Sequence, residues 1–307
     1  MAEALELLLL TDVHHGPSRV ARDAPPALDG LTSVLRRLER EPATLLLDLG
    51  DRINDVGPEQ DLRHLEEVAS AFALSTKERH HLLGNHDVKL LSQEENARVL
   101  GGPVGHTVLR RAGWTLLLWS PPPLYRRDGC LVPEDDVAWL VRALDELDGP
   151  AALFTHVPFH AGSMLGNYYF EGDHAGGAVY RDAERLLPLL LANDHVKVAV
   201  AGHVHWNSVN VVDGVPFLTV QSVSELATTA PRPAGAWARL RLEPDAVALH
   251  VHGLDGFQVR LQLREAGRHW LRRRGLPSWS ATPPASRADA EGTASDKIRE
   301  SASPGTE

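Results

Sequence analysis

The sequence predicts an α/β fold, and three features indicate it. Short apolar runs typical of buried strands occur throughout roughly the first 220 residues. Longer stretches with apolar residues at helical spacing lie between these runs, and such alternation is characteristic of α/β domains. Farther along the chain, two apolar runs flank Asp213 and Gly214, a pair that favours a type I′ turn and therefore an antiparallel hairpin.

The predicted strands of the first part are short, apolar and followed at once by Asp, Gly or His, as buried strands that end in functional loops are. They span residues 5–11, 44–49, 79–83, 115–119, 151–155 and 196–201. The helices expected between them span residues 28–40, 61–74, 133–147 and 181–192. In the third helix, Pro133 suits the first turn, and the three acidic residues after it favour the positive end of the helix dipole.

The last part of the chain is expected to add antiparallel strands. These strands span residues 208–212, 215–220, 236–242 and 246–252. We expect them to complete a second sheet, so that residues 1–275 form one domain. From residue 276 the chain is rich in Ser, Pro, Ala, Gly and charged residues with little to bury, which predicts a disordered tail over residues 276–307.

The composition is that of a globular protein, with 43% hydrophobic and 23% charged residues. Cys130 is the only cysteine, which excludes an intramolecular disulfide framework and favours a reducing compartment. The apolar run at residues 7–10 is too short to span a membrane and lacks the features of a signal peptide, so we expect a cytoplasmic protein without a membrane partner. The net charge of −10 argues against nucleic acid as a partner. No oligomeric state is predicted.

Five short motifs rich in Asp, His and Asn follow predicted strands in nearly every case. They are D-V-H at 12–14, G-D-R-I-N at 50–54, G-N-H-D at 84–87, T-H at 155–156 and G-H-V-H at 202–205. A D-x-H triplet is common by chance, and a lone histidine after a strand is more often structural than a ligand. G-H-x-H is uncommon and G-N-H-D is rarer, so their joint occurrence at strand ends indicates one site.

The residue types of these motifs favour divalent metal ions, because carboxylate and imidazole are ligands for Zn, Mn and Fe. Side chains alternate along a strand, so Asp12 and His14 are expected to point the same way, and His203 and His205 to lie side by side. The candidate ligands exceed what one ion needs but suit two ions that share a carboxylate and together clamp a phosphoryl group. They are Asp12, His14, Asp51, Asn85, His156, His203 and His205.

In this order the motifs resemble those of the calcineurin-like metallophosphoesterase superfamily, over residues 12–205. The resemblance implies a sandwich of two mixed β-sheets flanked by helices and a metal-dependent phosphoric ester hydrolase. Within the superfamily, G-N-H-D and the sequence T-H-V-P at 155–158 look most like the branch that includes cyclic-nucleotide and glycerophosphodiester phosphodiesterases.

The resemblance also implies a role for each residue. Asp12, His14 and His205 would hold the first metal, Asp51 would bridge, and Asn85, His156 and His203 would hold the second. His86 would stabilise the transition state or protonate the leaving group, and Asp87 would orient His86 by accepting its other ring proton. Mn²⁺ is the expected metal, with Fe, Zn, Ni and Co as alternatives. A hydroxide bridging both ions would attack, since metals can lower the pKa of water to about 7.

The substrate pocket is described less well by the motifs. Residues 158–180 follow His156 and are expected to form a loop over the metals, on which Tyr168 and Tyr169 either stack on a substrate or pin the loop to the body. His15, Asn54 and His160 are further candidates for substrate binding, because they lie beside proposed ligands in sequence; for Asn54, supporting the site is the alternative role. Two arginines at 126–127 either contact phosphate or are solvated.

Several functions are compatible with this core. The leading hypothesis is a phosphodiesterase acting on a small nucleotide-like or glycerol phosphodiester. A DNA or RNA nuclease and a nucleotide-diphosphate hydrolase would use the same core, although the acidic composition disfavours the nuclease. A non-catalytic metal-binding scaffold is the remaining alternative, and it is disfavoured because every ligand position is filled.

Overall fold

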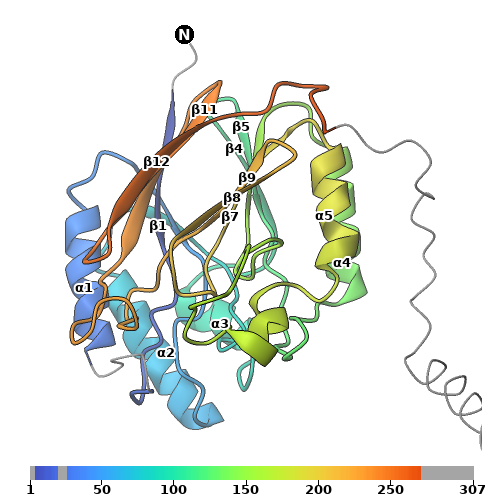
Figure 1. Cartoon of the computed structure of the whole chain (residues 1–307). Coiled ribbons are helices and arrows are strands. Elements are labelled where there is room, and N and C mark those ends of the chain that lie inside the picture. The colour runs from blue at the N-terminus through green and yellow to red at the C-terminus, as the bar shows by residue number, and fades with distance from the viewer. Residues whose placement is uncertain (1–3, 20–25, 271–307) are drawn as a thin grey trace, which may run out of the picture. The chain divides into compact units, whose positions relative to one another are not determined.

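Two six-stranded β-sheets pack face to face in the computed structural model, which describes residues 4–19 and 26–270 (Figure 1). The first sheet has the order β12-β11-β10-β1-β2-β3. Its strands are β1 (Leu5–Leu10), β2 (Leu45–Asp48), β3 (Glu78–His81), β10 (Trp237–Leu242), β11 (Ala246–His252) and β12 (Phe257–Gln262). β1, β2 and β3 are parallel, whereas β10 pairs antiparallel with β1 and begins an antiparallel half.

The second sheet has the order β4-β5-β6-β7-β9-β8. Its strands are β4 (Thr107–Arg111), β5 (Trp114–Leu118), β6 (Ala151–Phe154), β7 (Val196–Ala201), β8 (Ser208–Val212) and β9 (Val215–Thr219). β5, β6, β7 and β9 are parallel, and the two edge strands run antiparallel to their neighbours. Both sheets are therefore mixed, which confirms the fold class.

Helices cover the outer face of each sheet and complete four layers. α1 (Ala27–Leu38), α2 (Pro58–Phe72) and α3 (Gln93–Leu100) lie on the side of the first sheet, and α4 (Glu134–Asp145) and α5 (Ala183–Ala192) on the side of the second (Figure 1). β1 is leucine-rich because both of its faces are buried. Leu7 and Leu9 pack between the sheets, whereas Leu8 and Leu10 pack against α1.

The expected strands and helices are present, with small differences at their ends. The turn between β8 and β9 has φ 48° at Asp213 and φ 74° at Gly214, as a type I′ hairpin requires. The strands expected at 236–242 and 246–252 were predicted to complete the second sheet, which is wrong. They join the first sheet, because the edge of β1 opposite β2 pairs with β10 and brings Leu240 and Leu249 into the core between the sheets.

Two edge strands, β4 and β12, and the short helix α3 were not predicted. The tail expected at 276–307 lies outside the described residues. None of the helices in the described part of the chain is long and apolar enough to cross a membrane.

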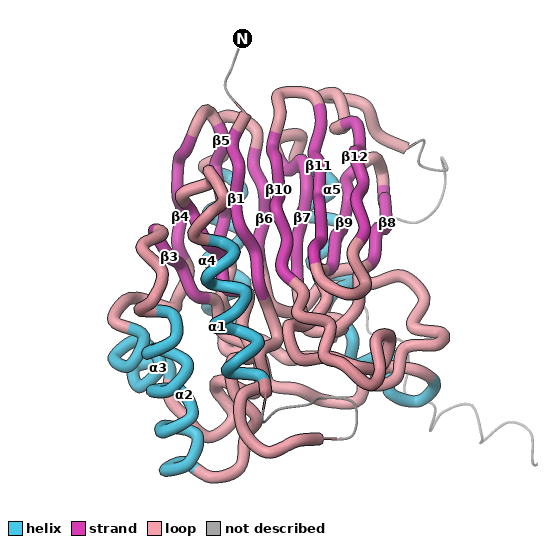
Figure 2. Tube along the Cα trace, turned by 90° about the vertical axis from the view of Figure 1, so that its left-hand side faces the viewer, coloured by secondary structure: helices cyan, strands magenta, loops and turns pink. Residues whose placement is uncertain are grey.

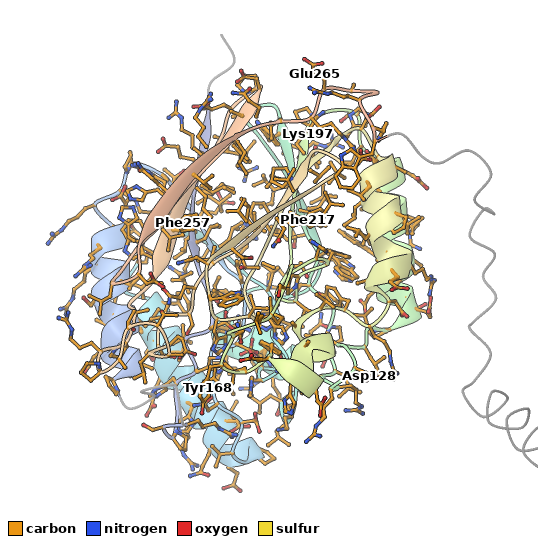
Figure 3. The ribbon with its side chains drawn as sticks, viewed as in Figure 1. Asp128, Tyr168, Lys197, Phe217, Phe257 and Glu265 are labelled. Atoms are coloured by element: carbon orange, nitrogen blue, oxygen red, sulfur yellow. The ribbon has the colours of Figure 1, made fainter. Side chains whose placement is uncertain are left out.

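The loops that follow the parallel strands gather at one end of the sandwich, below the strands in Figure 2. Figure 3 shows Tyr168 and Asp128 at this end, and Lys197 and Glu265 at the opposite end. The motifs of the sequence all lie in the loops of the first end, so the fold brings together side chains from both sheets.

Candidate metal centre

The candidate ligands converge where the parallel strands of both sheets finish, but simple strand alternation does not bring them together. Five of them have a left-handed backbone: Asp12 (φ 55°), His14 (φ 50°), Asp51 (φ 55°), His203 (φ 68°) and His205 (φ 58°). Among the other described non-glycine residues, only Ala112 and Asp213 share this conformation, and both lie in hairpin turns. A non-glycine residue held this way costs about 1–3 kcal/mol, and such strain is concentrated at functional sites.

Two glycines allow the close approach of these loops. A Cβ atom at Gly84 would overlap Asp51, and one at Gly202 would overlap Thr11 and Asp12. Glycine is therefore required where the loops after β2 and β3, and those after β1 and β7, meet.

The first cluster contains Asp12, His14 and His205, all buried. The Nε2 atoms of His14 and His205 lie 2.9 Å apart, and Asp12 Oδ1 lies 3.3 Å from His205 Nε2. The other oxygen of Asp12 accepts hydrogen bonds from the Thr11 hydroxyl and the His203 backbone N–H. Oδ1 is left without a hydrogen bond from the described residues and faces the two imidazoles.

The second cluster contains Asp51, His156 and His203, also buried. His156 Nδ1 donates to the Leu49 carbonyl at 2.9 Å, so Nε2 is the ring atom that would bind a metal once its proton is displaced. His203 Nε2 donates to the Gly177 carbonyl at 2.9 Å, which leaves Nδ1 as its ligand atom. Backbone carbonyls thus fix the tautomer of each histidine, as is usual for metal-binding imidazoles.

Asp51 connects the clusters. Its Oδ2 atom lies 3.7 Å from His14 Nε2 and 3.3 Å from His156 Nε2, and its Oδ1 atom accepts the His86 backbone N–H at 2.8 Å. This is the geometry of a carboxylate placed to serve two ions. The alternation argument had placed His203 and His205 side by side, but the structure directs them into different clusters.

The donor set fits two divalent ions. Asp12 Oδ1, Asn85 Oδ1 and His156 Nε2 are buried without a hydrogen bond from the described residues. Buried polar atoms are rarely left unsatisfied, and metal coordination would satisfy these three. The nature of the groups, carboxylate, amide and imidazole, matches the preferences of Mn, Fe and Zn.

The protonation states of the protein groups at the site favour cations. Burial alone would raise the pKa values of Asp12 and Asp51, but the neighbouring histidines hold both pKa values well below the usual range. Burial alone would lower the pKa of His156, but the Asp51 carboxylate raises it to about 9. Burial, reinforced by His156, lowers the pKa of His203 to about 4. Two carboxylates are thus ionised, and one ligand histidine carries a proton that a metal must displace.

His86 extends over the first cluster and is oriented by Asp55. The ring centroids of His86 and His14 lie 5.0 Å apart, and His86 forms a group with His14 and Asp51. His86 Nδ1 makes a short hydrogen bond to the Asp55 carboxylate, which also accepts from Lys89 Nζ at 2.6 Å. Burial would raise the pKa of Asp55, but these two contacts outweigh it and hold the pKa well below its usual range.

Asp87 does not orient His86, so that prediction is wrong. The Asp87 carboxylate points into the interior, where it accepts backbone N–H groups of Asp51, Arg52 and Gly84 at 2.8–2.9 Å. It also pairs with the buried Arg52 guanidinium at 2.9 Å, which in turn pairs with Asp48 at 2.7 Å. Asp87 therefore braces the loops that carry Asp51 and Asn85.

Glu225 is a further residue of the candidate site, and the sequence analysis did not identify it. Its Oε2 atom accepts the His205 Nδ1 proton at 3.0 Å, and its Oε1 atom accepts the backbone N–H groups of Leu226 and Ala227. This contact fixes the tautomer of His205 with Nε2 facing the first cluster. The available signal was a carboxylate shortly after the apolar strand β9.

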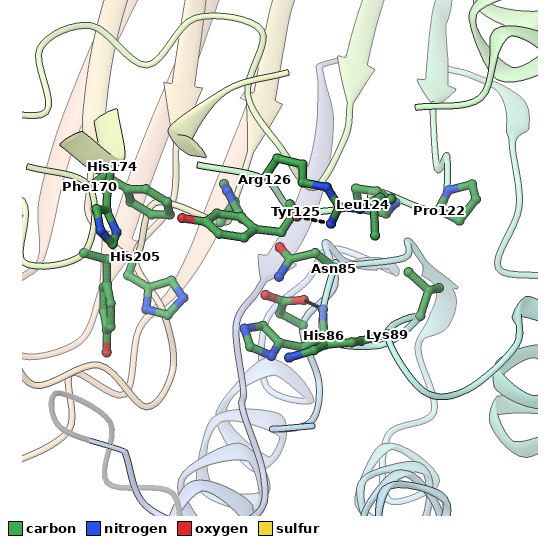
Figure 4. Close-up of a pocket in the computed structure, with 15 residues that line it drawn as sticks. Asn85, His86, Lys89, Pro122, Leu124, Tyr125, Arg126, Phe170, His174 and His205 are labelled. Carbon is green, nitrogen blue, oxygen red and sulfur yellow. Dashed lines mark hydrogen bonds between the residues drawn. The ribbon is translucent and has the colours of Figure 1, made fainter. Parts of the chain in front are cut away.

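A cavity of about 530 Å³ opens over the metal centre (Figure 4). Tyr125 and Arg126 lie over Asn85 and His86, and His205 lies on the opposite side beside Phe170 and His174 (Figure 4). We call this cavity 1; its lining residues are Asp51, Asn85, His86, Val88, Lys89, Pro122, Pro123, Leu124, Tyr125, Arg126, Tyr169, Phe170, His174, His203 and His205.

A second cavity of about 500 Å³, cavity 2, adjoins cavity 1 and shares Tyr169 and His205 with it. The other residues that line cavity 2 are Gly166, Asn167, Tyr168, Glu171, Val204, Trp206, Glu225, Leu226, Ala227, Thr228 and Ala230. Residues 158–180 thus contribute to both cavities, as expected for a loop over the metals. The loop is also pinned: Phe170 is buried, with its ring 5.0 Å from that of His203, while Tyr168 is 55% exposed.

Three candidates for substrate binding, His15, Asn54 and His160, do not occur among the described residues that line either cavity. His15 pairs with Glu67. Asn54 donates to the Pro17 carbonyl at 2.9 Å and so supports the His14 loop. The ring of His160 lies 6.1 Å from that of Phe217, against the second sheet. None of the three side chains lines either cavity, so their role as substrate contacts stays a prediction.

Fold and site together define a metal-dependent phosphoester hydrolase. The chain belongs to the calcineurin-like phosphoesterase family, whose model matches residues 5–207. No curated protein sequence matches this chain.

Solved structures share the fold at low sequence identity. A dimetal phosphatase from Danio rerio is 17% identical over 85% of this chain and 99% of its own, with a TM-score of 0.67. A purple acid phosphatase from yellow lupin seeds is 12% identical over 85% of this chain and 54% of its own, with a TM-score of 0.62. GAP50, the anchor in the inner membrane complex of Plasmodium, is 11% identical over 86% of this chain and 90% of its own, with a TM-score of 0.57.

Proposed function

We propose that the protein is a two-metal phosphodiesterase whose substrate is a small nucleotide-like or glycerol phosphodiester. The observation that carries this proposal is that two cavities adjoin at the metal centre and share the ligand His205. A phosphate monoester has one organic arm to accommodate, whereas a diester has two. Each cavity has about the volume of a small-molecule site, 530 and 500 Å³.

The chain's own residues have distinct tasks in this reaction. When bound, the two divalent ions activate water and stabilise negative charge on the phosphoryl oxygens. Asp51 and the tautomer-fixed histidines hold the ligand atoms in place. His86 Nδ1 is engaged by Asp55, so its Nε2 atom is available to give a proton to the leaving oxygen. Arg126 lines cavity 1 and supplies positive charge for the anionic substrate.

The finer features of this function are also proposals. We propose Mn²⁺ as the metal, with Fe, Zn, Ni or Co as alternatives, because the donor types accept all of them. We also propose a cytoplasmic enzyme without nucleic-acid or membrane partners. The carboxylates of Glu171 and Glu225 at cavity 2 and the net charge of −10 would repel a polyanionic strand.

The test compares bis(p-nitrophenyl) phosphate with p-nitrophenyl phosphate, using protein loaded with two equivalents of Mn²⁺. We expect a higher kcat/KM for the diester, and loss of both activities on chelation. A matched control is His160→Ala, because His160 lies outside both cavities and should leave the ratio unchanged. A tenfold preference for the monoester would indicate a phosphatase, and efficient cutting of linear DNA a nuclease. No turnover with two metals bound would indicate a scaffold.

A further inference from the structure

Tyr125 lines cavity 1 and extends over the candidate metal centre. Figure 4 shows its phenol ring above Asn85, with the hydroxyl end directed toward the side of the cavity where His205 lies. The centroid of the ring is 6.4 Å from that of His203, a candidate ligand of the second cluster. The phenol therefore faces the space in which the phosphoryl group of a substrate would lie.

The hydroxyl of Tyr125 is available to a ligand. The side chain is partly buried, yet its hydroxyl forms no hydrogen bond with any described residue. By contrast, the hydroxyl of the buried Tyr180 pairs with that of Thr155 at 2.6 Å, as buried tyrosine hydroxyls usually do. A tyrosine hydroxyl can donate one hydrogen bond, and at this position a phosphoester supplies an anionic oxygen as the acceptor.

Gly177 determines where the phenol lies. A Cβ atom at Gly177 would be 2.8 Å from the hydroxyl oxygen and from Cε2 of Tyr125, and 3.0 Å from its Cζ. These distances are shorter than nonbonded atoms tolerate. Gly177 is not one of the described glycines with positive φ, so its backbone does not itself require glycine. The ring of Tyr125 occupies the space that a side chain at position 177 would need.

The backbone of Gly177 is held in place from two directions. Its carbonyl accepts the hydrogen bond from His203 Nε2 at 2.9 Å. The preceding residue, Gly176, packs directly against a neighbouring loop, because a Cβ atom there would be 2.9 Å from the carbonyl oxygen of Arg127 and 3.0 Å from Cα of Asp128. Since these contacts hold the backbone, a side chain at position 177 would displace the phenol instead.

We propose that Tyr125 is a substrate-binding residue whose hydroxyl donates a hydrogen bond to a phosphoryl oxygen, and that Gly177 positions this hydroxyl. The inference rests on the proposed hydrolase function and adds a residue that contacts the reacting group. Gly177 links the cavity wall to the centre, since its carbonyl orients His203 and its lack of a side chain leaves room for the phenol. A fixed donor aimed at the oxygens that gain negative charge lowers the energy of the transition state.

The first experiment removes the hydroxyl. It uses the full chain loaded with two equivalents of Mn²⁺, with inorganic phosphate as the probe in isothermal titration calorimetry and bis(p-nitrophenyl) phosphate as the substrate. Tyr125→Phe should raise the Kd for phosphate and lower kcat/KM by about five- to tenfold each, the effect of one lost hydrogen bond, with two metals still bound. An unchanged Kd for phosphate would overturn the contact.

The matched control is Tyr180→Phe, which also removes one tyrosine hydroxyl. Tyr180 does not occur among the described residues that line either cavity, and its hydroxyl pairs with Thr155. This variant should lower the melting temperature and leave the Kd for phosphate unchanged. A general loss of stability is thereby separated from the loss of a substrate contact.

A double-mutant cycle tests the role of Gly177. Gly177→Ala should raise the Kd for phosphate about as much as Tyr125→Phe does, because the displaced phenol no longer reaches the phosphate. Tyr125→Ala removes all three atoms that the new Cβ atom would meet, so adding Gly177→Ala to it should cause no further loss. Gly149→Ala is the control, since a Cβ atom there meets nothing within 4 Å. Losses that add would show that Gly177 acts without Tyr125 and would overturn its positioning role.

A measurement without substrate separates the two contacts of Gly177. In protein stripped of metal by chelation, the ring ¹⁵N shifts of His203 report which nitrogen carries the proton. They should show a protonated Nε2 in both the wild-type chain and Gly177→Ala, because the carbonyl of residue 177 stays in place. A changed tautomer would mean that Gly177→Ala acts by moving His203, and would overturn the displacement of Tyr125 as the cause.

Failure of the inference and failure of the proposed function look different. Turnover of the diester with two metals bound, and a Kd for phosphate that neither Tyr125→Phe nor Gly177→Ala changes, would overturn this inference alone. No phosphate binding and no turnover by the metal-loaded wild-type chain would overturn the proposed function as well.

Discussion

The candidate metal centre and the walls of the two cavities differ in burial and in hydrogen bonding. At the centre, each candidate ligand histidine is buried. Three of them also make a hydrogen bond through one ring nitrogen: His156 to the Leu49 carbonyl, His203 to the Gly177 carbonyl and His205 to the Glu225 carboxylate. The walls are loop residues, several of them exposed, such as Tyr168 at 55%. The groups of the centre are therefore held by buried hydrogen bonds, whereas several wall residues are exposed, so changes in the two regions should have effects of very different size.

The largest effect is expected at Asp51, because its carboxylate serves both clusters. Asp51→Ala should remove both ions and lower kcat/KM by about 10³-fold or more, since two-metal stabilisation contributes several kcal/mol. The measurements are metal content by mass spectrometry and turnover of bis(p-nitrophenyl) phosphate. Asp148→Ala, at a carboxylate whose side chain is 78% exposed, is the control. An Asp51→Ala protein with two metals and full activity would show that the centre is wrongly assigned.

The sequence predicted most of the first region and little of the second. The candidate ligands could be placed at one end of the fold, because ligand-type residues directly followed apolar strands. The core strands were predicted from their continuous apolar runs. β12 lacks such a run, because it alternates between partly buried and exposed residues as an edge strand does. Helix α3 is short, with eight residues, but Ser92 and Glu95 form a capping box, a sequence pattern from which its first residue could have been predicted.

The direction of individual side chains could not be predicted. Asp87 was assigned to His86 because the two are adjacent in sequence, yet Asp55 makes that contact from another loop. Left-handed residues such as Asp12 and His205 break the alternation on which the argument relied. Glu225 reaches His205 across twenty positions of sequence, and a carboxylate after a strand does not by itself specify which residue it contacts.

The next largest effect concerns stability. Asp87→Asn leaves the buried Arg52 without one of its carboxylates and should lower the free energy of unfolding by about 3–5 kcal/mol. Thermal unfolding followed by circular dichroism measures this loss. Asp55→Asn is the comparison, because the Asp55 carboxylate pairs with His86 and Lys89 rather than with Arg52, and it should lower the melting temperature much less. Equal losses for both variants would contradict the bracing role of Asp87.

Asp55→Asn should instead impair catalysis. Without the Asp55 carboxylate, His86 loses the group that orients its ring, so kcat should fall about 10–100-fold while two metals remain bound. Turnover of the diester, with metal content measured on the same sample, tests this. A loss of bound metal in proportion to the loss of kcat would mean that Asp55 acts on the ions rather than on His86.

Metal binding should release protons, because Asp51 raises the pKa of His156 to about 9. The histidine is thus protonated at pH 7.5 in the metal-free protein, and a metal must displace that proton. Below pH 9 the affinity of the second cluster for metal should rise about tenfold per pH unit, and above pH 9 this affinity should become independent of pH. Isothermal titration calorimetry in two buffers of different ionisation enthalpy gives the number of protons released. A value near zero at pH 7.5 would contradict the raised pKa.

The smallest effect is expected at the cavity wall, where neighbouring arginines form a matched pair. Arg126 lines cavity 1, Arg127 is absent from the described lining of both cavities, and neither has an ion pair with a described carboxylate. Arg126→Gln should raise KM for an anionic diester about two- to fivefold with kcat unchanged, because an exposed charge contributes less than about 1 kcal/mol. The increase should vanish at high salt, whereas Arg127→Gln should change neither constant. A fall in kcat at Arg126→Gln would place this side chain in the catalytic centre and break the division between the two regions.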